Sequence, residues 1–215
     1  MPKSTPLGPL ADDRSLAELS PADRLCELVF ELPLAGGDRP RADVRLGDLA
    51  PVLARHLAAD DPLVGYGELL SHPPLADESL KGYLTGSIDA VLRIGPPTRR
   101  RYLVVDYKTN WLGRGEPGEL SVADSAPPAL AAAMQAAHYP LQALLYDVAL
   151  HRMLRWRLSD YDPERHLGGA LYLFLRGMAG PETPRVAGVP HGVFSWKPRA
   201  TLVTELSDLL DRGPR

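Results

Sequence analysis

The segment YLTGSIDAVLRIGPPTRRRYLVVDYKT, residues 83–109, contains two apolar runs joined by a short stretch rich in proline and glycine. The first run alternates, with Ile88, Ala90, Leu92 and Ile94 on one face. Alternation with a period of two is typical of a strand, and two such runs joined by a short turn predict a β-hairpin. If the hairpin is symmetric about the bond between residues 97 and 98, positions equally distant from that bond face one another.

The second run places an acid and a base inside an apolar strand. Asp106 and Lys108 are two residues apart, so they project from the same face. In the symmetric hairpin Asp89 faces Asp106, and directly opposed like charges destabilise a sheet. A shared proton, an ion pair with Lys108 or a divalent cation could each offset the repulsion, and two carboxylates suit Mg²⁺ or Mn²⁺. The alternative is an exposed strand face with a simple Asp–Lys pair across the strands.

The rest of the chain mixes strand and helix patterns. We expect further strands at 24–34, 169–178 and 191–198, helices at 46–59 and 198–212, and a helical stretch at 127–158 that Pro140 breaks or kinks. Residues 1–21 show no sustained period and are predicted to be a loose arm, with one short helical turn near residues 15–19. These patterns predict an α/β or α+β domain built on a mixed sheet.

Composition narrows the possible functions. The chain has 215 residues, 45% apolar and 24% charged, which fits one large globular domain. Its formal net charge of -3 confines any nucleic-acid contact to local basic patches. The single cysteine, Cys26, excludes an internal disulfide, a cysteine-only zinc site and a four-cysteine iron–sulfur cluster. Without an export signal or a long apolar stretch, we expect a cytoplasmic protein with no membrane contact.

Four segments in order carry a family resemblance: GSIDAVLR, VVDYKTNWLG, AAAMQAAHYPLQALLYDVALHRMLRWRLSDYD and HLGGALYLFLRGM. Together they resemble the C-terminal nuclease domain of RecB-type helicase-nucleases, in the PD-(D/E)xK or restriction-endonuclease-like superfamily. A lone D-x-K is common by chance, whereas the full set over residues 24–195 is specific. The resemblance implies an α/β fold with a restriction-endonuclease-like mixed β-sheet flanked by helices, spanning residues 22–215.

The resemblance also implies a metal site. Asp89 and Asp106 match the two acidic ligands of the family, and the main-chain carbonyl of Tyr107 matches a position that also faces the metal. Lys108 matches the catalytic lysine that positions or activates the attacking water. The implied cofactor is Mg²⁺.

Three more residues match the family pattern at greater distance along the chain. Gln142 and Tyr146 match its Q-x-x-x-Y element, and one helical turn brings such residues to the same face. Glu27 matches an acidic residue on the early strand, and Glu31 is a competing candidate for that position. Ordinary helix surface is the alternative for Gln142 and Tyr146.

One ligand of the family has no match. A histidine on a helix upstream of the position of Asp89 completes the family's metal site, and this chain begins after that helix. His56 and His72 lie in the wrong context to replace it. The chain also lacks a Gly-rich phosphate-binding loop, so we expect a fragment of a larger helicase-nuclease, truncated at the N-terminal end of the nuclease domain.

The implied function is that of a Mg²⁺-dependent exodeoxyribonuclease, the nuclease module of an ATP-dependent helicase-nuclease in double-strand break repair and recombination. Arg152, Arg155 and Arg157 could follow a DNA backbone, or could only keep the helix soluble. The resemblance implies DNA, RecC-like and RecD-like subunits and a RecA-type recombinase as partners. The alternative is a catalytically impaired docking module of the same fold that binds partner subunits or a recombinase.

Overall fold

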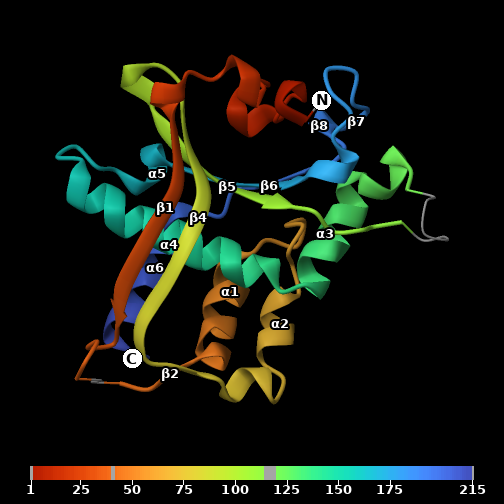
Figure 1. The fold of residues 1–215 in the computed structure, drawn as a ribbon. Coiled ribbons are helices and arrows are strands. Elements are labelled where there is room, and N and C mark those ends of the chain that lie inside the picture. The colour runs from red at the N-terminus through yellow and green to blue at the C-terminus, as the bar shows by residue number, and fades with distance from the viewer. Residues whose placement is uncertain (1, 40–41, 114–119, 215) are drawn as a thin grey trace. The chain divides into compact units, whose positions relative to one another are not determined.

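The computed structural model describes residues 2–39, 42–113 and 120–214. The chain divides into two compact units that alternate along the sequence. Unit 1 comprises Met1–Leu28, Ile88–Tyr139 and Arg165–Lys197, and unit 2 comprises Val29–Ser87, Pro140–Glu164 and Pro198–Arg215. Figure 1 labels strands β1 (Arg24–Leu34) and β4 (Gly82–Ile94) and helix α4 (Tyr139–Arg157). Each of these three elements contributes residues to both units. The predicted boundary between residues 21 and 22 lies inside unit 1.

The main sheet has five strands in the order β1-β4-β5-β6-β9. Its remaining strands are β5 (Arg101–Lys108), β6 (Leu167–Phe174) and β9 (Val193–Trp196). Strand β5 is antiparallel to β4 and parallel to β6, and β9 is antiparallel to β6. A parallel pair needs a long crossover connection, and the helical stretch between β5 and β6 supplies it. The mixed sheet with its helices confirms the predicted α/β class and is compatible with a restriction-endonuclease-like fold.

The hairpin formed by β4 and β5 has the predicted register. Ala90 pairs with Val105 and Ile94 pairs with Arg101, so each pair is equally distant from the bond between residues 97 and 98. A 3-10 turn at Pro97–Arg99 closes the hairpin. The side chains predicted to share the inner face of β4 are all buried.

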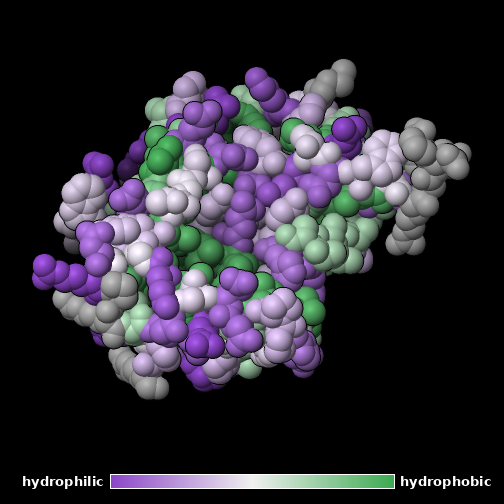
Figure 2. Space-filling model, turned by 60° about the horizontal axis from the view of Figure 1, so that its bottom comes forward, coloured by the Kyte–Doolittle hydropathy of each residue, from purple (hydrophilic) through white to green (hydrophobic). Residues whose placement is uncertain are grey.

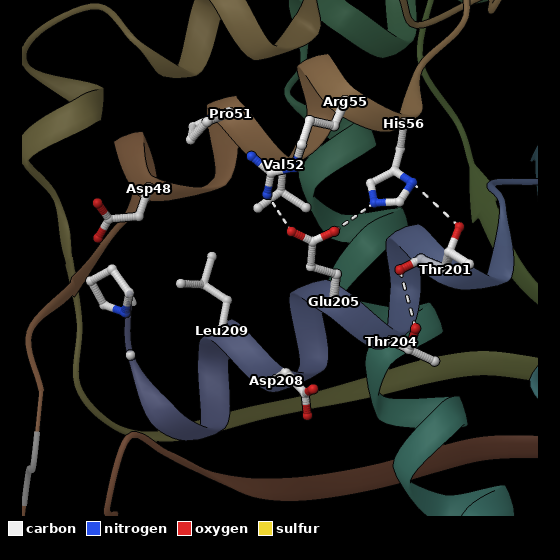
Figure 3. Close-up of a pocket in the computed structure, with 12 residues that line it drawn as sticks. Asp48, Pro51, Val52, Arg55, His56, Thr201, Thr204, Glu205, Asp208 and Leu209 are labelled. Atoms are coloured by element: carbon white, nitrogen blue, oxygen red, sulfur yellow. Dashed lines mark hydrogen bonds and ion pairs between the residues drawn. The ribbon is translucent and has the colours of Figure 1, made fainter.

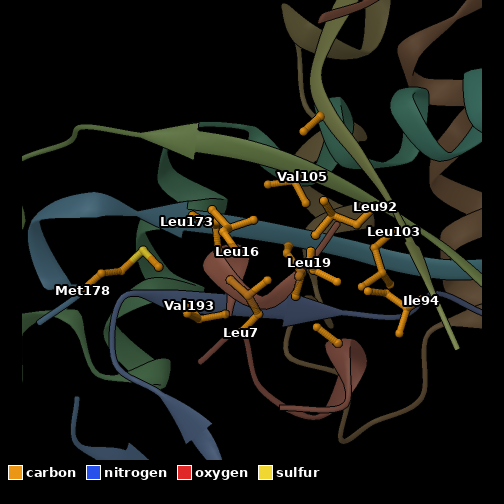
Figure 4. Packing of buried hydrophobic residues seen from close by; sticks show 13 residues of the cluster. Leu7, Leu16, Leu19, Leu92, Ile94, Leu103, Val105, Leu173, Met178 and Val193 are labelled. Atoms are coloured by element: carbon orange, nitrogen blue, oxygen red, sulfur yellow. The ribbon is translucent and has the colours of Figure 1, made fainter. Parts of the chain in front are cut away.

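One face of the sheet in unit 1 packs against the N-terminal segment (Figure 4). Leu7, Leu16 and Leu19 are buried in the same hydrophobic cluster as Leu92 and Leu103. The prediction of a loose arm is therefore wrong. Isolated leucines separated by short 3-10 turns have no helical or strand period, yet each covers part of the sheet. The turn predicted near residues 15–19 is present as Leu16–Glu18, and the others are Pro2–Ser4, Pro9–Ala11 and Pro21–Asp23.

The helical stretch after β5 is broken as predicted. Helix α3 (Pro127–Ala136) ends before α4 begins at Tyr139, and Pro140 occupies the first turn of α4. His138 between them has a positive φ of 53°, which ends one helix and reorients the chain for the next. Helix α5 (Pro163–His166) has residues in both units. The remaining elements of unit 1 are short 3-10 turns and the strands β7 (Arg185–Val186) and β8 (Val189–Pro190).

Unit 2 combines helices with a small two-stranded sheet. Strand β2 (Val44–Arg45) pairs with β3 (Ser79–Leu80). The helix predicted at 46–59 begins as a 3-10 turn, Leu46–Leu49, and continues as α1 (Ala50–His56). Helix α2 (Tyr66–Leu70) lies where the sequence analysis predicts no helix, and α6 (Ala200–Arg212) is the predicted closing helix.

The visible surface is mostly hydrophilic. Figure 2 shows polar side chains over much of one face, with smaller hydrophobic areas between them. Among the large apolar side chains of the described residues, that of Trp156 is the most exposed, at 78%. Across the described ranges, no helix has the length and apolar character that crossing a membrane requires.

Candidate functional site

Two carboxylates lie on neighbouring strands of the sheet in unit 1. The pairing of β4 with β5 ends at Ala90 and Val105, and Asp89 and Asp106 are the next residues along the two strands. The charge of Asp89 acts on the carboxyl group of Asp106, so the two acids lie near each other. Oδ2 of Asp89 accepts a hydrogen bond from the main-chain N–H of Tyr107 at 2.9 Å, which holds this carboxylate against β5. Asp106 is only 4% exposed. The strands therefore bring together two acids, one partly accessible and one buried.

Lys108 supplies the charge that the buried carboxylate needs. Its Nζ lies 2.7 Å from Oδ2 of Asp106, and its side chain is 12% exposed. Burial raises the pKa of Asp106, the nearby ammonium of Lys108 lowers it, and the charge of Asp89 raises it further. Asp106 and Lys108, which are predicted to lie on one face of the strand, therefore form a close ion pair.

Two tyrosines that sequence reasoning missed complete the surroundings of Lys108. Its Nζ lies 3.8 Å from the ring centroid of Tyr139 and 5.3 Å from that of Tyr172. Tyr172 is paired with Asp106 in the parallel register of β5 and β6, so an alignment of these two strands could have found it. Tyr139 is the first residue of α4, and no pattern in the sequence connects it to the hairpin.

The donor set of this site fits a hard divalent cation. Oδ2 of Asp106 is buried and has no geometrically good hydrogen-bond partner among the described residues, although the ammonium of Lys108 is close. A buried carboxylate oxygen with unused acceptor capacity can accept a cation. Over the same described residues, no three His, Cys, Asp or Glu side chains are grouped to hold a metal ion. Asp89 and Asp106 would therefore need main-chain, water or substrate oxygens to complete a metal's coordination.

Glu27 lies on β1 with an unusual backbone conformation. Its φ is 54°, in the left-handed region, and its side chain is exposed. Non-glycine residues with this φ are uncommon, and they are often found near functional sites. Neighbouring residues of β1 influence Tyr107, since the pKa of that phenol is raised first by burial and then by Cys26. The role of Glu27 stays a prediction, as does that of Glu31, which is exposed in unit 2.

Gln142 and Tyr146 lie in unit 2 and contact each other. Nε2 of Gln142 donates to the hydroxyl of Tyr146 at 3.0 Å, which confirms that one helical turn brings the two together. The ring of Tyr146 meets Phe30 edge to face, with centroids 5.9 Å apart. Phe30 packs over Gly86, where any Cβ would lie 2.8 Å from its ring. The pair is thus a positioned part of unit 2, and its participation in the metal site stays a prediction.

The three arginines predicted to contact DNA differ in what they do. Arg152 donates to Oγ and O of Ser207 at 3.0 and 2.8 Å and to O of Pro33 at 3.1 Å. Its guanidinium is therefore hydrogen-bonded inside unit 2, and a contact of Arg152 with DNA stays a prediction. Arg155 and Arg157 are exposed, and the guanidinium of Arg157 lies 4.6 Å from the ring centroid of Trp156.

His56 lines a cavity of unit 2 (Figure 3). The cavity measures about 560 Å³ and lies between α1 and α6. Nε2 of His56 is 2.6 Å from Oε2 of Glu205, and Arg55 makes an ion pair with the same carboxylate. These contacts lower the pKa of Glu205, with the hydrogen bond to His56 as the larger cause. His56 is thus committed to Glu205, and His72 is exposed.

A second buried aspartate lies in unit 2. Asp147 is 1% exposed, and neither of its carboxyl oxygens has a hydrogen-bond partner in the described part of the chain. Burial raises its pKa to about 8. His151, one turn further along α4, lies with Nδ1 2.8 Å from the hydroxyl of Tyr161, and burial lowers its pKa to about 4. Both groups are thus kept neutral by the apolar interior.

The relatives that comparison with known proteins finds all carry the same name. No family model matches the chain. The RecBCD enzyme subunit RecB of Mycolicibacterium smegmatis is 56% identical over 208 residues, which cover 96% of this chain and 19% of that protein. The subunit of the same name from Mycobacterium tuberculosis is 56% identical over 211 residues, covering 97% of this chain and 18% of that protein.

A more distant relative shows the same relation. RecBCD enzyme subunit RecB of Escherichia coli is 36% identical over 197 residues, covering 91% of this chain and 14% of that protein. The chain thus spans less than a fifth of the length of these relatives. Over nearly its whole length, the chain is homologous to a segment of RecBCD enzyme subunit RecB.

Proposed function

We propose that this chain is a nuclease module that hydrolyses DNA phosphodiesters with Mg²⁺. The observation that carries the proposal is the grouping of Asp89, Asp106 and Lys108 on two paired strands, with a buried carboxylate oxygen that still has acceptor capacity. The same three positions match the D and D-x-K elements of the PD-(D/E)xK superfamily. Homology to RecB subunits supports the same reading.

The site residues suit a magnesium ion. Asp89, Asp106 and the main-chain carbonyl of Tyr107 would hold it, with water and phosphate oxygens in the remaining positions. When bound, the ion supplies Lewis-acid stabilisation of phosphate charge and favours deprotonation of a nearby water. These ligands are all oxygens, as the ion prefers.

Lys108 has a separate part in the proposed reaction. Its ammonium is held beside Asp106, where it can donate a hydrogen bond to a phosphate oxygen or to the attacking water. In hydrolysis the water oxygen bonds to phosphorus while the bond from phosphorus to the 3′ oxygen breaks, which leaves a 5′-phosphate and a 3′-hydroxyl. Contacts to phosphate carry no sequence information, so no base preference is needed.

The biological setting follows from the relatives. They are subunits of RecBCD enzymes, so the proposed setting is a helicase-nuclease in double-strand break repair and recombination. RecC-like and RecD-like subunits and a RecA-type recombinase are the proposed protein partners. DNA is the proposed substrate, with exonucleolytic degradation as its outcome.

Substitution of the paired charges tests this function. Asp106→Ala and Lys108→Ala should each abolish Mg²⁺-dependent DNA degradation by the complete protein, because each removes a group at the reacting phosphate. Asp60→Ala changes an exposed acid and serves as the matched control. Circular dichroism should show folded protein in every case. Nuclease activity at the wild-type level in either site variant would refute the assignment.

Metal binding can be measured without any reaction. Isothermal titration of this chain with Mg²⁺ or Mn²⁺ should show weak binding, because two carboxylates alone provide few ligands. Asp89→Asn should remove the binding. Tight binding that survives this change would show that the cation sits elsewhere.

A second candidate function is a docking module for partner subunits. Trp156 favours it, because a tryptophan that is 78% exposed beside an arginine is typical of an interaction hot spot. Trp156→Ala should then weaken assembly with RecC-like and RecD-like subunits, measured by size-exclusion chromatography. Unchanged assembly together with active nuclease would remove this candidate.

A further inference from the structure

We propose that Tyr139 and Tyr172 form an aromatic pair that positions the ammonium of Lys108 for the reaction. The inference rests on the proposed function for its catalytic consequence, but its geometry belongs to unit 1 alone. Both rings lie within cation–π range of Nζ, at 3.8 and 5.3 Å. Asp106 approaches the same nitrogen at 2.7 Å. The ammonium is therefore held by one carboxylate and two ring systems.

The aromatic pair is itself fixed in place. The two rings are stacked, with centroids 5.9 Å apart and planes inclined by 27°. The hydroxyl of Tyr139 donates to Oδ1 of Asn110 at 3.2 Å, and the hydroxyl of Tyr172 lies 3.4 Å from the main-chain oxygen of Tyr139. Tyr172 is fully buried on β6, which lies between β5 and β9 in the sheet. These contacts join the start of α4 to β5 and β6, so the pair presents a rigid surface to the lysine.

A rigid surface matters because of the side chain that it holds. Lysine has a long flexible stem, and its ammonium is a point charge without the fixed geometry of a guanidinium. A charged group that contributes to a transition state must be within a fraction of an ångström of its working position. The ion pair with Asp106 fixes only one direction of approach. The ring faces limit the others without competing for the hydrogen atoms that a phosphate or water would accept.

The aromatic pair therefore acts through Lys108 and not on the substrate. Tyr139 and Tyr172 are positioning residues, and their effect should depend on the ring and not on the hydroxyl. Tyr139→Phe keeps the ring face and loses only the bond to Asn110. Tyr139→Leu removes the ring face, so the two variants separate positioning from the hydroxyl contact.

Nuclear magnetic resonance provides a readout that needs neither metal nor DNA. In the chain labelled with ¹³C-lysine, ring currents should shift the Cε methylene signal of Lys108 upfield, and Lys108→Met identifies that signal by its loss. The shift should persist in Tyr139→Phe and be much reduced in Tyr139→Leu, where only the more distant ring of Tyr172 remains. A Lys108 signal at the ordinary lysine position in the wild-type chain would overturn the aromatic pair itself, whatever the nuclease result.

Kinetics of the complete protein with Mg²⁺ test the consequence. Tyr139→Leu should lower kcat by about 10-fold to 100-fold with little change in KM, because positioning is lost and substrate contacts are not. Tyr139→Phe should stay near the wild-type kcat. If the Leu variant keeps the wild-type kcat while its ring-current shift is much reduced, the positioning role is refuted. An inactive wild-type protein that retains the ring-current shift would refute the proposed function and leave the geometry standing.

Loss of folding is separated from loss of positioning by a variant on the other ring. Tyr172→Leu should reproduce the loss of kcat if the pair works as proposed, and Tyr172→Phe should not. Thermal unfolding followed by circular dichroism reports whether each variant is folded at the assay temperature. A folded Tyr172→Leu with wild-type kcat would overturn the contribution of that ring.

Discussion

Asp106 in unit 1 and Asp147 in unit 2 are both buried aspartates, but only one has a partner. Asp106 is 4% exposed and lies beside the ammonium of Lys108, with Nζ 2.7 Å from Oδ2. Asp147 is 1% exposed, and neither of its oxygens has a partner among the described residues. Burial raises the pKa of both, and only Lys108 acts against this effect at Asp106.

The difference separates a reactive acid from a structural one. A carboxylate supported by a neighbouring cation can stay charged in a dry environment and is available to a second cation. A carboxyl group without such support is cheaper to bury in its neutral form. Burial alone is therefore a poor guide to the function of a carboxyl group. The charged groups beside it are a better guide.

The largest expected difference between the two aspartates is in nuclease activity. Asp106→Asn should lower Mg²⁺-dependent nuclease activity by at least about 100-fold, because a charged ligand near the phosphate is replaced by a neutral amide. Asp147→Asn should leave activity near wild type, since neither carboxyl oxygen of Asp147 has a hydrogen-bond partner among the described residues. The measurement is release of acid-soluble nucleotides from duplex DNA by the complete protein. Equal losses in both variants would contradict the distinction.

The second effect is the pH dependence of stability. The pKa of Asp147 is raised to about 8, so its contribution to stability is present at low pH and is lost as pH rises toward that value. The slope should approach about 1.4 kcal/mol per pH unit. The effect of His151 on stability has the opposite pH dependence. Its pKa is lowered to about 4, so it costs stability only as pH falls below the ordinary pKa of histidine.

The clean window for this test therefore lies between about pH 6.5 and pH 8, above the titration of an unfolded histidine. Urea unfolding of the isolated chain should show a free energy of unfolding that falls across this window. Asp147→Leu and Asp147→Asn should both flatten the dependence. A slope that persists in both variants would place the titrating group elsewhere.

A third change would leave Asp106, like Asp147, buried without a neighbouring cation. Lys108→Met removes the ammonium and keeps much of the apolar stem, so the free energy of unfolding at pH 7 should fall by about 2 kcal/mol. The double variant Lys108→Met/Asp106→Asn should recover part of that loss, because no buried charge remains. Chemical denaturation in EDTA measures both. A double variant less stable than the sum of its single changes would argue against the ion pair.

The smallest effect compares two arginines of α4. Arg152→Ala should lower the free energy of unfolding by about 1 to 2 kcal/mol, because it leaves acceptors on Ser207 and Pro33 unpaired. Arg155→Ala changes an exposed side chain and should alter stability by less than about 0.5 kcal/mol. Thermal unfolding of the two variants gives the comparison. Equal destabilisation by the two variants would mean that the exposure of an arginine does not decide its contribution to stability.

Much of the fold could be predicted because it depends on local patterns in the sequence. The register of the hairpin followed from a short turn and strict alternation, and the break before α4 followed from Pro140. Both depend on neighbours in the chain, where backbone geometry is nearly sufficient. The predicted arm at residues 1–21 failed for the opposite reason, since Leu7 and Leu16 are buried by a sheet face formed far away in the sequence.

The candidate site divides in the same way. Asp89, Asp106 and Lys108 share one hairpin, so a strand period and a register place them together. Tyr172 reaches Lys108 through a parallel pairing with β6, and Tyr139 reaches it from the start of α4. The hydrogen bonds of Arg152 inside unit 2 likewise depend on Ser207 of α6, which lies 55 residues further along the chain.

The sequence by itself determined the hairpin, the pair of carboxylates and the lysine beside them, because side-chain alternation and turn geometry act over short distances. Only the tertiary structure decided which buried aspartate has a cation beside it, which tyrosines surround that cation and which arginines remain exposed. These depend on packing between distant segments, where the free energy of burial and of ion pairing is set by neighbours that no local pattern specifies.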